Sequence, residues 1–183
     1  MKDKFITLKQ LLEDNNDEDP SYGELLLTKE WRDFRKIILK RDNHQCQICK
    51  REGNQLAWWL KDMGEFYVRP STEIEKKYLN NDIEYCSTHV ELHVHHKYYV
   101  KDHYPWQYSE DALITVCMEC HDNIHNNEEI PVYLKIDKEI KLPTCKCAKC
   151  NGKGYIKTYK YYMNGVCFSC DGAGYKILNN SLE

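Results

Sequence analysis

The chain has 183 residues, of which 42% are hydrophobic and 30% charged, and its formal net charge is −3. This length gives one or two small domains, and the slightly acidic balance excludes a surface that is basic throughout, so any nucleic-acid contact must be local. No apolar run approaches the roughly 20 residues of a membrane span, and the N-terminal MKDKFITLKQLLED lacks the features of a signal peptide, so we expect a cytoplasmic protein that does not span a membrane.

Residues 1–27 are an expected N-terminal extension with an acidic run from Glu13 to Asp19. Such a run is typical of a solvated loop, and mimicry of nucleic-acid charge is the alternative interpretation. A helix is predicted to begin after Thr28, a favoured N-cap residue. The face of this helix that lies opposite its hydrophobic residues is basic, and is either solvated or directed at phosphates. Hydrophobic residues at helical spacing predict its buried face: Trp31, Phe34, Ile37 and Ile38.

An insertion is expected at residues 52–91, between two pairs of cysteines. Its aromatic residues favour packing, with a short helix over residues 71–79 and a turn over residues 80–82. Because the flanking cysteine pairs must meet at one zinc ion, we expect the insertion to fold onto the core.

Residues 92–125 are rich in histidine. The polarity of the chain alternates here, so His93 and His95 are predicted on one face of a strand, with His96 near its end. A second strand at residues 112–116 and a helix follow. Residues four apart on a helix share a face, so two histidines of that helix could hold one metal ion, namely His121 and His125.

The C-terminal part divides into an expected linker at residues 131–143 and a zinc-binding ribbon at residues 144–183. The ribbon contains the motif C-x-x-C-x-G-x-G-Y twice, and glycine lets the chain turn tightly around a metal. A hairpin arm is expected between the two copies, at residues 155–162. Interleaved lysines and aromatic rings favour either a nucleic-acid surface or a structural ribbon with solvated lysines. The expected nucleic-acid contacts are Lys153, Lys157 and Lys160.

Eight of the ten cysteines form four C-x-x-C pairs, which supply two tetrahedral zinc sites without remainder. The first site is expected from Cys46, Cys49, Cys117 and Cys120, and the second from Cys147, Cys150, Cys167 and Cys170. The remaining Cys86 and Cys145 are expected to be small buried hydrophobes.

Three stretches together resemble the HNH endonucleases of the ββα-metal class in their zinc-supported form: RDNHQCQIC (41–49), LHVHHKYY (92–99) and LITVCMECHDNIH (113–125). The resemblance implies an α+β fold, with a nuclease domain at residues 28–130 that includes the N-terminal helix. The ribbon resembles the cysteine-rich zinc finger of DnaJ-type chaperones. A co-chaperone role is not implied, because the chain has no His-Pro-Asp sequence.

The resemblance also implies roles for four histidines. His95, His121 and His125 would hold a catalytic divalent ion (Mg, Mn, Ni or Zn), and imidazole ligands favour the last three. His96 would be the general base that activates water against a phosphodiester. A His93–His95 pair is the alternative metal site.

One position departs from the family pattern, because Ala112 stands where the motif has Asn. Three possibilities are open: Glu110 or Asp111 substitutes, a backbone carbonyl holds the His96 ring, or activity is reduced. The expected function is a metal-dependent endonuclease acting on DNA, with a homodimer as one possible assembly. The alternative is a non-catalytic zinc module that binds nucleic acid or protein and carries a degenerate HNH site.

Overall fold

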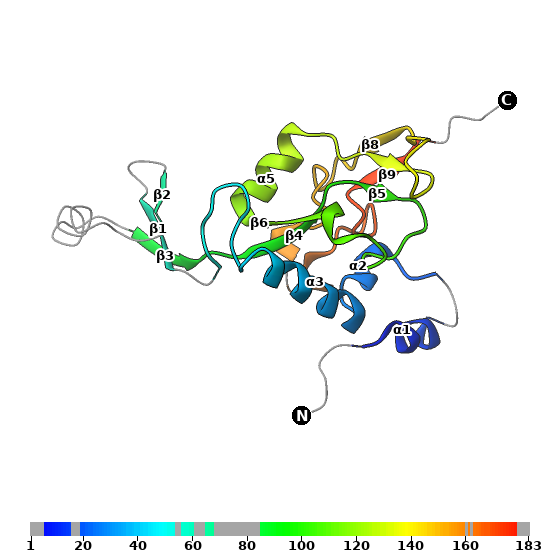
Figure 1. Ribbon diagram of the computed structural model, residues 1–183, viewed down its shortest axis with the longest axis horizontal. Coiled ribbons are helices and arrows are strands. Elements are labelled where there is room, and N and C mark those ends of the chain that lie inside the picture. Colours follow the sequence, from blue (N-terminus) through cyan, green and yellow to red (C-terminus); the bar gives the residue numbers. More distant parts are fainter. Residues whose placement is uncertain are drawn as a thin grey trace.

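A computed structural model describes residues 6–15, 19–53, 56–60, 65–67, 85–159, 161 and 163–178. The fold combines helices with small β-sheets (Figure 1). The α-helices are α1 (Leu8–Asp14), α2 (Tyr22–Leu25), α3 (Lys29–Arg41) and α5 (Met118–Asn127). The strands are β1 (Leu56–Leu60), β2 (Glu65–Tyr67), β3 (Tyr85–His89), β4 (Leu92–His96), β5 (Tyr99–Val100), β6 (Leu113–Cys117), β7 (Val132–Tyr133), β8 (Thr144–Lys146) and β9 (Tyr175–Ile177). None of the helices in these ranges has the length and apolar character needed to cross a bilayer.

Helix α3 begins where its sequence predicts. The Thr28 hydroxyl caps its N-terminus by accepting a hydrogen bond from the backbone N–H of Trp31. Trp31 and Ile38 are buried, but Ile37 is 50% exposed. The prediction for Ile37 is therefore wrong, because the buried stripe continues instead through Leu39, which lies on the other side of Ile38 along the helix.

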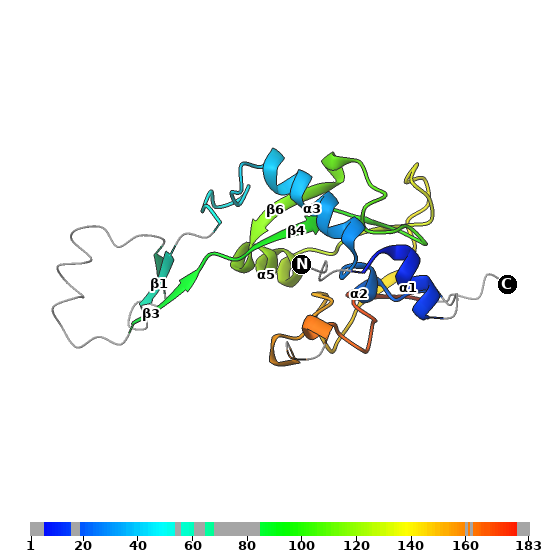
Figure 2. The same ribbon diagram turned by 90° about the horizontal axis from the view of Figure 1, so that it is seen from below.

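The antiparallel pair β4–β6 lies between α3 and α5 (Figures 1 and 2). His95 pairs with Ile114 in this ladder and His96 with Leu113. The strand–strand–helix order expected for residues 92–125 is present, with α5 following β6 directly. The end of α3 is tied to β6 because the Asp42 carboxylate accepts a hydrogen bond from the backbone N–H of Thr115, at 2.9 Å.

Strands β1, β2 and β3 of the insertion form one antiparallel sheet, in the order β2-β1-β3. This sheet extends to one side of α3 and α5 instead of covering them (Figures 1 and 2). The chain leaves for the insertion beside its point of return, since a Cβ on Gly53 would lie 2.5 Å from the Leu92 side chain. The cysteine pairs can thus meet without the insertion folding onto the core. The helix and turn predicted at residues 71–82 lie outside the described residues.

The linker and the C-terminal segment contain less strand than their sequence pattern suggests. In the linker, β7 pairs with β5 in parallel, while Ile136 and Ile140 are more than half exposed. We call residues 144–178 the tail; its strands β8 and β9 pair antiparallel. The predicted hairpin arm is a single bridge between Tyr155 and Val166 with two short 3-10 turns, and Cys145 is exposed, contrary to expectation.

Candidate metal centres and the histidine pocket

Four cysteines come together at the end of the β4–β6 pair and form what we call the core cluster: Cys46, Cys49, Cys117 and Cys120. The sulfurs of Cys49 and Cys117 are 3.6 Å apart. A tetrahedral zinc ion with Zn–S bonds of about 2.3 Å separates its sulfurs by about 3.8 Å, so the cluster could hold zinc.

Arg51 lies beside the core cluster and donates to two of its sulfurs, with Nε 3.1 Å from Cys49 Sγ and Nη2 3.2 Å from Cys117 Sγ. Partial burial raises the pKa of Cys49, but the hydrogen bonds from Arg51 outweigh it and leave the pKa at about 6. The thiolate form of Cys49 is therefore favoured near neutral pH, whereas burial raises the pKa of Cys117 and of Cys120.

The tail holds a second group of cysteines, the tail cluster: Cys147, Cys150, Cys167 and Cys170. The sulfurs of Cys147 and Cys167 are 3.9 Å apart, and those of Cys150 and Cys170 are 3.7 Å apart. Backbone N–H groups of Gly154 and Gly174 donate to the sulfurs of Cys150 and Cys170, each at 3.2 Å. These distances also fit a tetrahedral zinc ion.

Three histidines converge in a third group, the histidine cluster, to which β4 contributes His95 and α5 contributes His121 and His125. Their ligand nitrogens lie within 4.8 Å of one another, and the Nε2 atoms of His121 and His125 are 3.2 Å apart. Imidazole ligands on a zinc ion, with Zn–N bonds of about 2.0–2.1 Å, are separated by a similar distance. The cluster therefore has the geometry of a three-nitrogen metal site.

The histidine cluster is buried, because its side chains are only 3%, 8% and 3% exposed in chain order. Burial, together with mutual repulsion of the rings, lowers the pKa of His95 to about 3 and that of His121 to about 2. Burial and the Lys146 ammonium lower the pKa of His125 to about 4. All three rings are thus neutral at pH 7, which is the state that binds a metal.

His93 shares the strand face of His95, as predicted, but is not one of the converging ligands. Its ring stacks on that of His121, with centroids 5.1 Å apart and an interplanar angle of 12°. A stacked ring presents its face to its neighbour instead of a nitrogen lone pair. The arrangement therefore favours the set His95, His121 and His125 over the alternative His93–His95 pair.

His96 points to the other side of β4 and lies in an aromatic enclosure. Its ring stacks on Trp31 at 5.4 Å and meets Tyr108 edge-on at 4.8 Å. His96 Nε2 is 2.9 Å from the Pro105 carbonyl oxygen, which can only accept, so Nε2 carries the proton. Burial lowers the pKa of His96 to about 4, although the Pro105 carbonyl partly opposes this.

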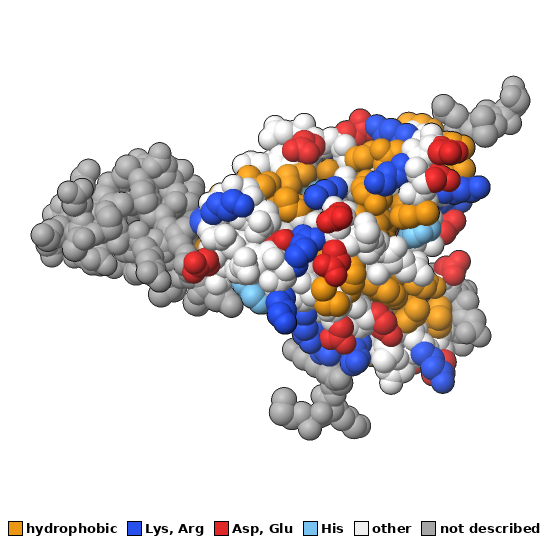
Figure 3. All heavy atoms as spheres, viewed as in Figure 1, with side chains coloured by type: hydrophobic (Ala, Val, Ile, Leu, Met, Phe, Trp, Pro, Cys, Tyr) orange, Lys and Arg blue, Asp and Glu red, His pale blue; other side chains and the backbone are white. Residues whose placement is uncertain are grey.

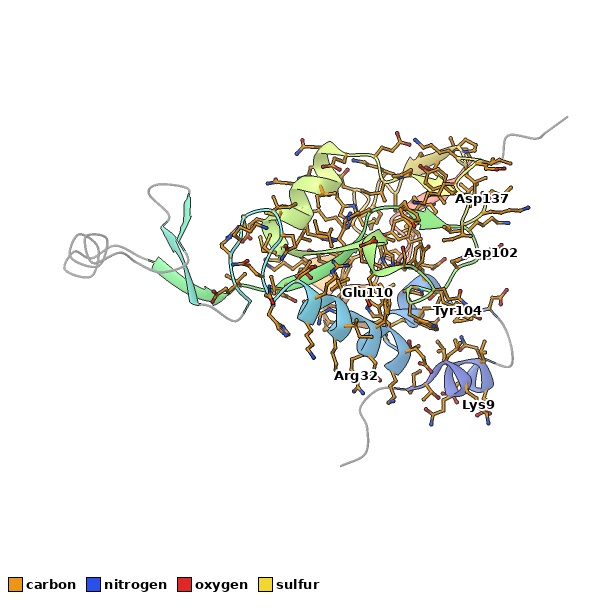
Figure 4. The ribbon with its side chains drawn as sticks, viewed as in Figure 1. Lys9, Arg32, Asp102, Tyr104, Glu110 and Asp137 are labelled. Atoms are coloured by element: carbon orange, nitrogen blue, oxygen red, sulfur yellow. The ribbon has the colours of Figure 1, made fainter. Side chains whose placement is uncertain are left out.

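The other nitrogen of His96, Nδ1, is 3.3 Å from the Tyr22 hydroxyl. Because His96 is neutral with its proton on Nε2, the hydroxyl donates to the Nδ1 lone pair. Of the three possibilities raised by Ala112, the structure has the second, a backbone carbonyl that holds the His96 ring. Glu110 and Asp111 are exposed, and it is their backbone carbonyls that accept hydrogen bonds, from Arg41 and Lys97 (Figure 4).

A pocket of about 280 Å³ joins the histidine cluster to His96. Its wall also includes Tyr22 from α2, two cations, Arg35 and Lys153, and Tyr155 from the tail. Lys153 forms an ion pair with Asp122 at 2.8 Å. The tail is attached beside this pocket through a hydrogen bond of 2.8 Å from the backbone N–H of Gly23 to the Asp171 carbonyl.

The predicted nucleic-acid contacts have different positions. Lys153 lies in the pocket wall, Lys157 is exposed, and Lys160 lies outside the described residues. Figure 3 shows Lys and Arg side chains interspersed with Asp and Glu on the face in view, in keeping with the small net charge.

Sequence reasoning missed Tyr22, Arg35 and Tyr155 as pocket residues. Ser21 and Glu24 form a capping box at the start of α2, and the spacing S-x-x-E is a readable helix-start signal. That signal could have placed a helix at Tyr22, but not its contact with His96.

No protein-family model matches the chain, and no curated protein or solved structure matches it either. Its function is therefore inferred from its own residues and their geometry.

Proposed function

We propose that this protein is a metal-dependent endonuclease of the HNH, ββα-metal type, which hydrolyses phosphodiester bonds in DNA. One observation carries the proposal: two different imidazole environments line one pocket. His95 converges with two histidines of α5, and the adjacent His96 is held as a single neutral tautomer. A site that holds only a structural ion has no need of the second environment.

A divalent ion in the histidine cluster would stabilise the charge that develops on the scissile phosphate and the leaving 3′ oxygen. Three imidazoles favour Zn, Ni or Mn over Mg, which prefers oxygen ligands. The contribution of the chain is to hold His95 on β4 opposite His121 and His125 on α5, with their rings neutral and buried.

His96 is the proposed general base. Because its Nε2 carries the proton donated to Pro105, its Nδ1 holds the lone pair that would accept a proton from the attacking water. The Tyr22 hydroxyl lies at that lone pair. The hydroxyl must therefore move away from Nδ1 when a water molecule takes its place beside the substrate.

Arg35 and Lys153 are the proposed phosphate contacts, since both are cationic and line the same pocket. Lys153 exchanges its ion pair with Asp122 for a phosphate in this proposal, whereas Arg35 is already anchored by its hydrogen bond to the Leu92 carbonyl.

The test is cleavage of supercoiled plasmid by the purified protein with Mg, Mn, Ni or Zn, and with EDTA. We expect metal-dependent nicking or linearisation, and a rate about 10²- to 10⁴-fold lower for His96→Ala, which is the usual contribution of general acid–base catalysis. His103→Ala is the matched control, because His103 lies in a loop and does not line the pocket. Equal cleavage by wild type and His96→Ala would contradict the proposal.

The second candidate is a non-catalytic zinc module that binds nucleic acid or protein. Ala112 at the motif position and the Tyr22 hydroxyl on His96 Nδ1 favour it. It predicts no cleavage with any metal, together with retained binding of DNA.

A further inference from the structure

We propose that the tail binds an unpaired nucleic-acid strand along a path that leads from exposed aromatic rings to the histidine pocket. The substrate would then be single-stranded, or would carry a single-stranded segment next to the cleaved bond. This inference deepens the proposed nuclease function and rests on it for the chemistry, but the binding path can be tested without cleavage.

The path begins at three rings in the turns of the tail. Phe168 is 62% exposed, Tyr161 is 85% exposed and Tyr159 is 36% exposed. The Tyr159 ring lies 6.3 Å from that of Tyr161 and 6.1 Å from that of Phe168. Exposed aromatic rings that gather on one surface, unlike rings scattered singly, indicate a binding surface.

Lysines accompany these rings. Lys149 Nζ lies 5.5 Å from the centroid of the Phe168 ring, and Lys157 belongs to the same short turn as Tyr159. Between Cys145 and Lys176 the only acidic residue is Asp171. The tail is therefore positively charged, although the chain as a whole is not, and this charge complements a phosphate backbone.

A cleft of about 360 Å³ lies beside these lysines, with Met118 and Asp122 of α5 in its wall. Lys149 and Lys157 line this cleft, and Lys153 and Tyr155 line both the cleft and the histidine pocket. Tyr155 also stacks over His93, with ring centroids 6.3 Å apart. Lysines and Tyr155 thus connect the surroundings of the exposed rings to the histidine pocket, and the Asp122 carboxylate in the cleft is paired with Lys153.

The mixture of rings and cations favours an unpaired strand over a duplex. Bases in a duplex stack on one another and leave no face for a protein ring, whereas unpaired bases stack on aromatic side chains with little dependence on sequence. A surface made for duplex phosphates needs the lysines alone. Unpaired bases would give the exposed rings of Tyr159, Tyr161 and Phe168 stacking partners.

The test is fluorescence anisotropy of a labelled oligonucleotide, single-stranded or as a duplex of equal length, with the full chain carrying His96→Ala to prevent cleavage. In this background, Tyr161→Ala and Phe168→Ala should each weaken single-strand binding about tenfold, a typical loss for one base-stacking ring. Phe168→Tyr keeps a stacking ring and should restore binding. A zinc content equal to that of the His96→Ala parent serves as the check that each variant is folded.

Tyr104→Ala is the aromatic control, because Tyr104 lines neither the pocket nor the cleft (Figure 4). Unchanged single-strand binding in the ring variants would overturn the inference, as would duplex binding that is equally tight and equally sensitive to them. Absence of any nucleic-acid binding would also overturn it and leave the rings as a protein-binding surface. Ring-dependent single-strand binding would support the inference even if the wild type cleaves no DNA, so the two proposals can fail separately.

Discussion

The core cluster and the tail cluster each consist of four cysteines, but the residues around them differ. Around the core cluster, buried aliphatic side chains form a continuous hydrophobic core: Leu39, Val90, Leu92, Val116 and Ile124. The buried residues of the tail cluster are the four cysteines themselves, with Ile156 packed against them. A metal in the core cluster would therefore fasten elements that already share a core, whereas a metal in the tail cluster would replace the core.

This difference has a physical reason. The tail is too short to bury enough apolar surface to offset the conformational entropy of folding, so we expect the free energy of metal binding to supply its stability. In the core, α3, β4, β6 and α5 bury apolar side chains against one another, so we expect their packing to depend less on a metal. C-x-x-C pairs in the two clusters can thus contribute unequally to the stability of one chain.

The largest effect is expected from Cys170→Ser. Loss of one ligand should remove zinc from the tail and unfold it, because zinc binding in such small modules contributes about 10–16 kcal/mol. Metal analysis should show one zinc ion fewer per chain than in the wild type, and amide signals of the tail should lose their dispersion in an NMR spectrum. A tail that keeps its dispersion without zinc would refute the comparison.

A smaller effect is expected from Cys49→Ser in the core cluster. Cys49 is the exposed ligand of the four, and the surrounding core should stay folded at a loss of roughly 4 kcal/mol. Chemical unfolding of the variant would measure this loss, and NMR should still show a dispersed core. Complete unfolding would mean that the core depends on metal as strongly as the tail does.

Alanine substitutions at two glycines of the tail distinguish the cost of backbone strain from the cost of a steric clash. A Cβ at Gly154 would lie 2.2 Å from the Gly172 carbonyl oxygen, whereas at Gly152 the nearest atom is 3.5 Å away, and both residues have positive φ. Gly152→Ala should therefore cost about 1 kcal/mol, and Gly154→Ala about 2–4 kcal/mol. Thermal unfolding of both variants compares them directly, and equal losses would show that the close approach can relax.

Arg51→Gln should affect the core cluster alone. Removing the hydrogen bonds to Cys49 and Cys117 should weaken zinc binding there about 10- to 100-fold. The pKa of Cys49 should rise from about 6, so protons compete with the metal sooner and zinc should be released at a higher pH as the solution is acidified. Titration with a chelating dye would measure both, and the tail cluster of the same variant is the internal control.

The smallest effect is expected from a substitution in α2, the helix that contacts both the tail and His96. Tyr22→Phe keeps the ring but removes the hydroxyl from His96 Nδ1. If His96 is the base, cleavage should become about 2- to 10-fold faster, which corresponds to one net hydrogen bond of about 0.5–1.5 kcal/mol. The rate of plasmid cleavage at saturating metal concentration measures this change. A slower variant would show that the hydroxyl assists the reaction.

The sequence by itself determined the features that depend on local spacing. The C-x-x-C pairs, the Thr28 cap, the alternation of His93 and His95 and the helical spacing of His121 and His125 were all readable, because backbone geometry places such residues on one face or at one turn. The same reasoning failed for Ile37, because neighbouring elements decide which side of a helix is covered.

Only the tertiary structure decided how these parts meet. The contact between Tyr22 and His96 spans 74 positions in the chain, and the Pro105 carbonyl reaches His96 across a loop. Lys153 of the tail lies in the pocket wall because α2 and the tail pack against β4. Such contacts have no period in the sequence, since they depend on where whole elements dock, and docking is set by the sum of many small packing terms.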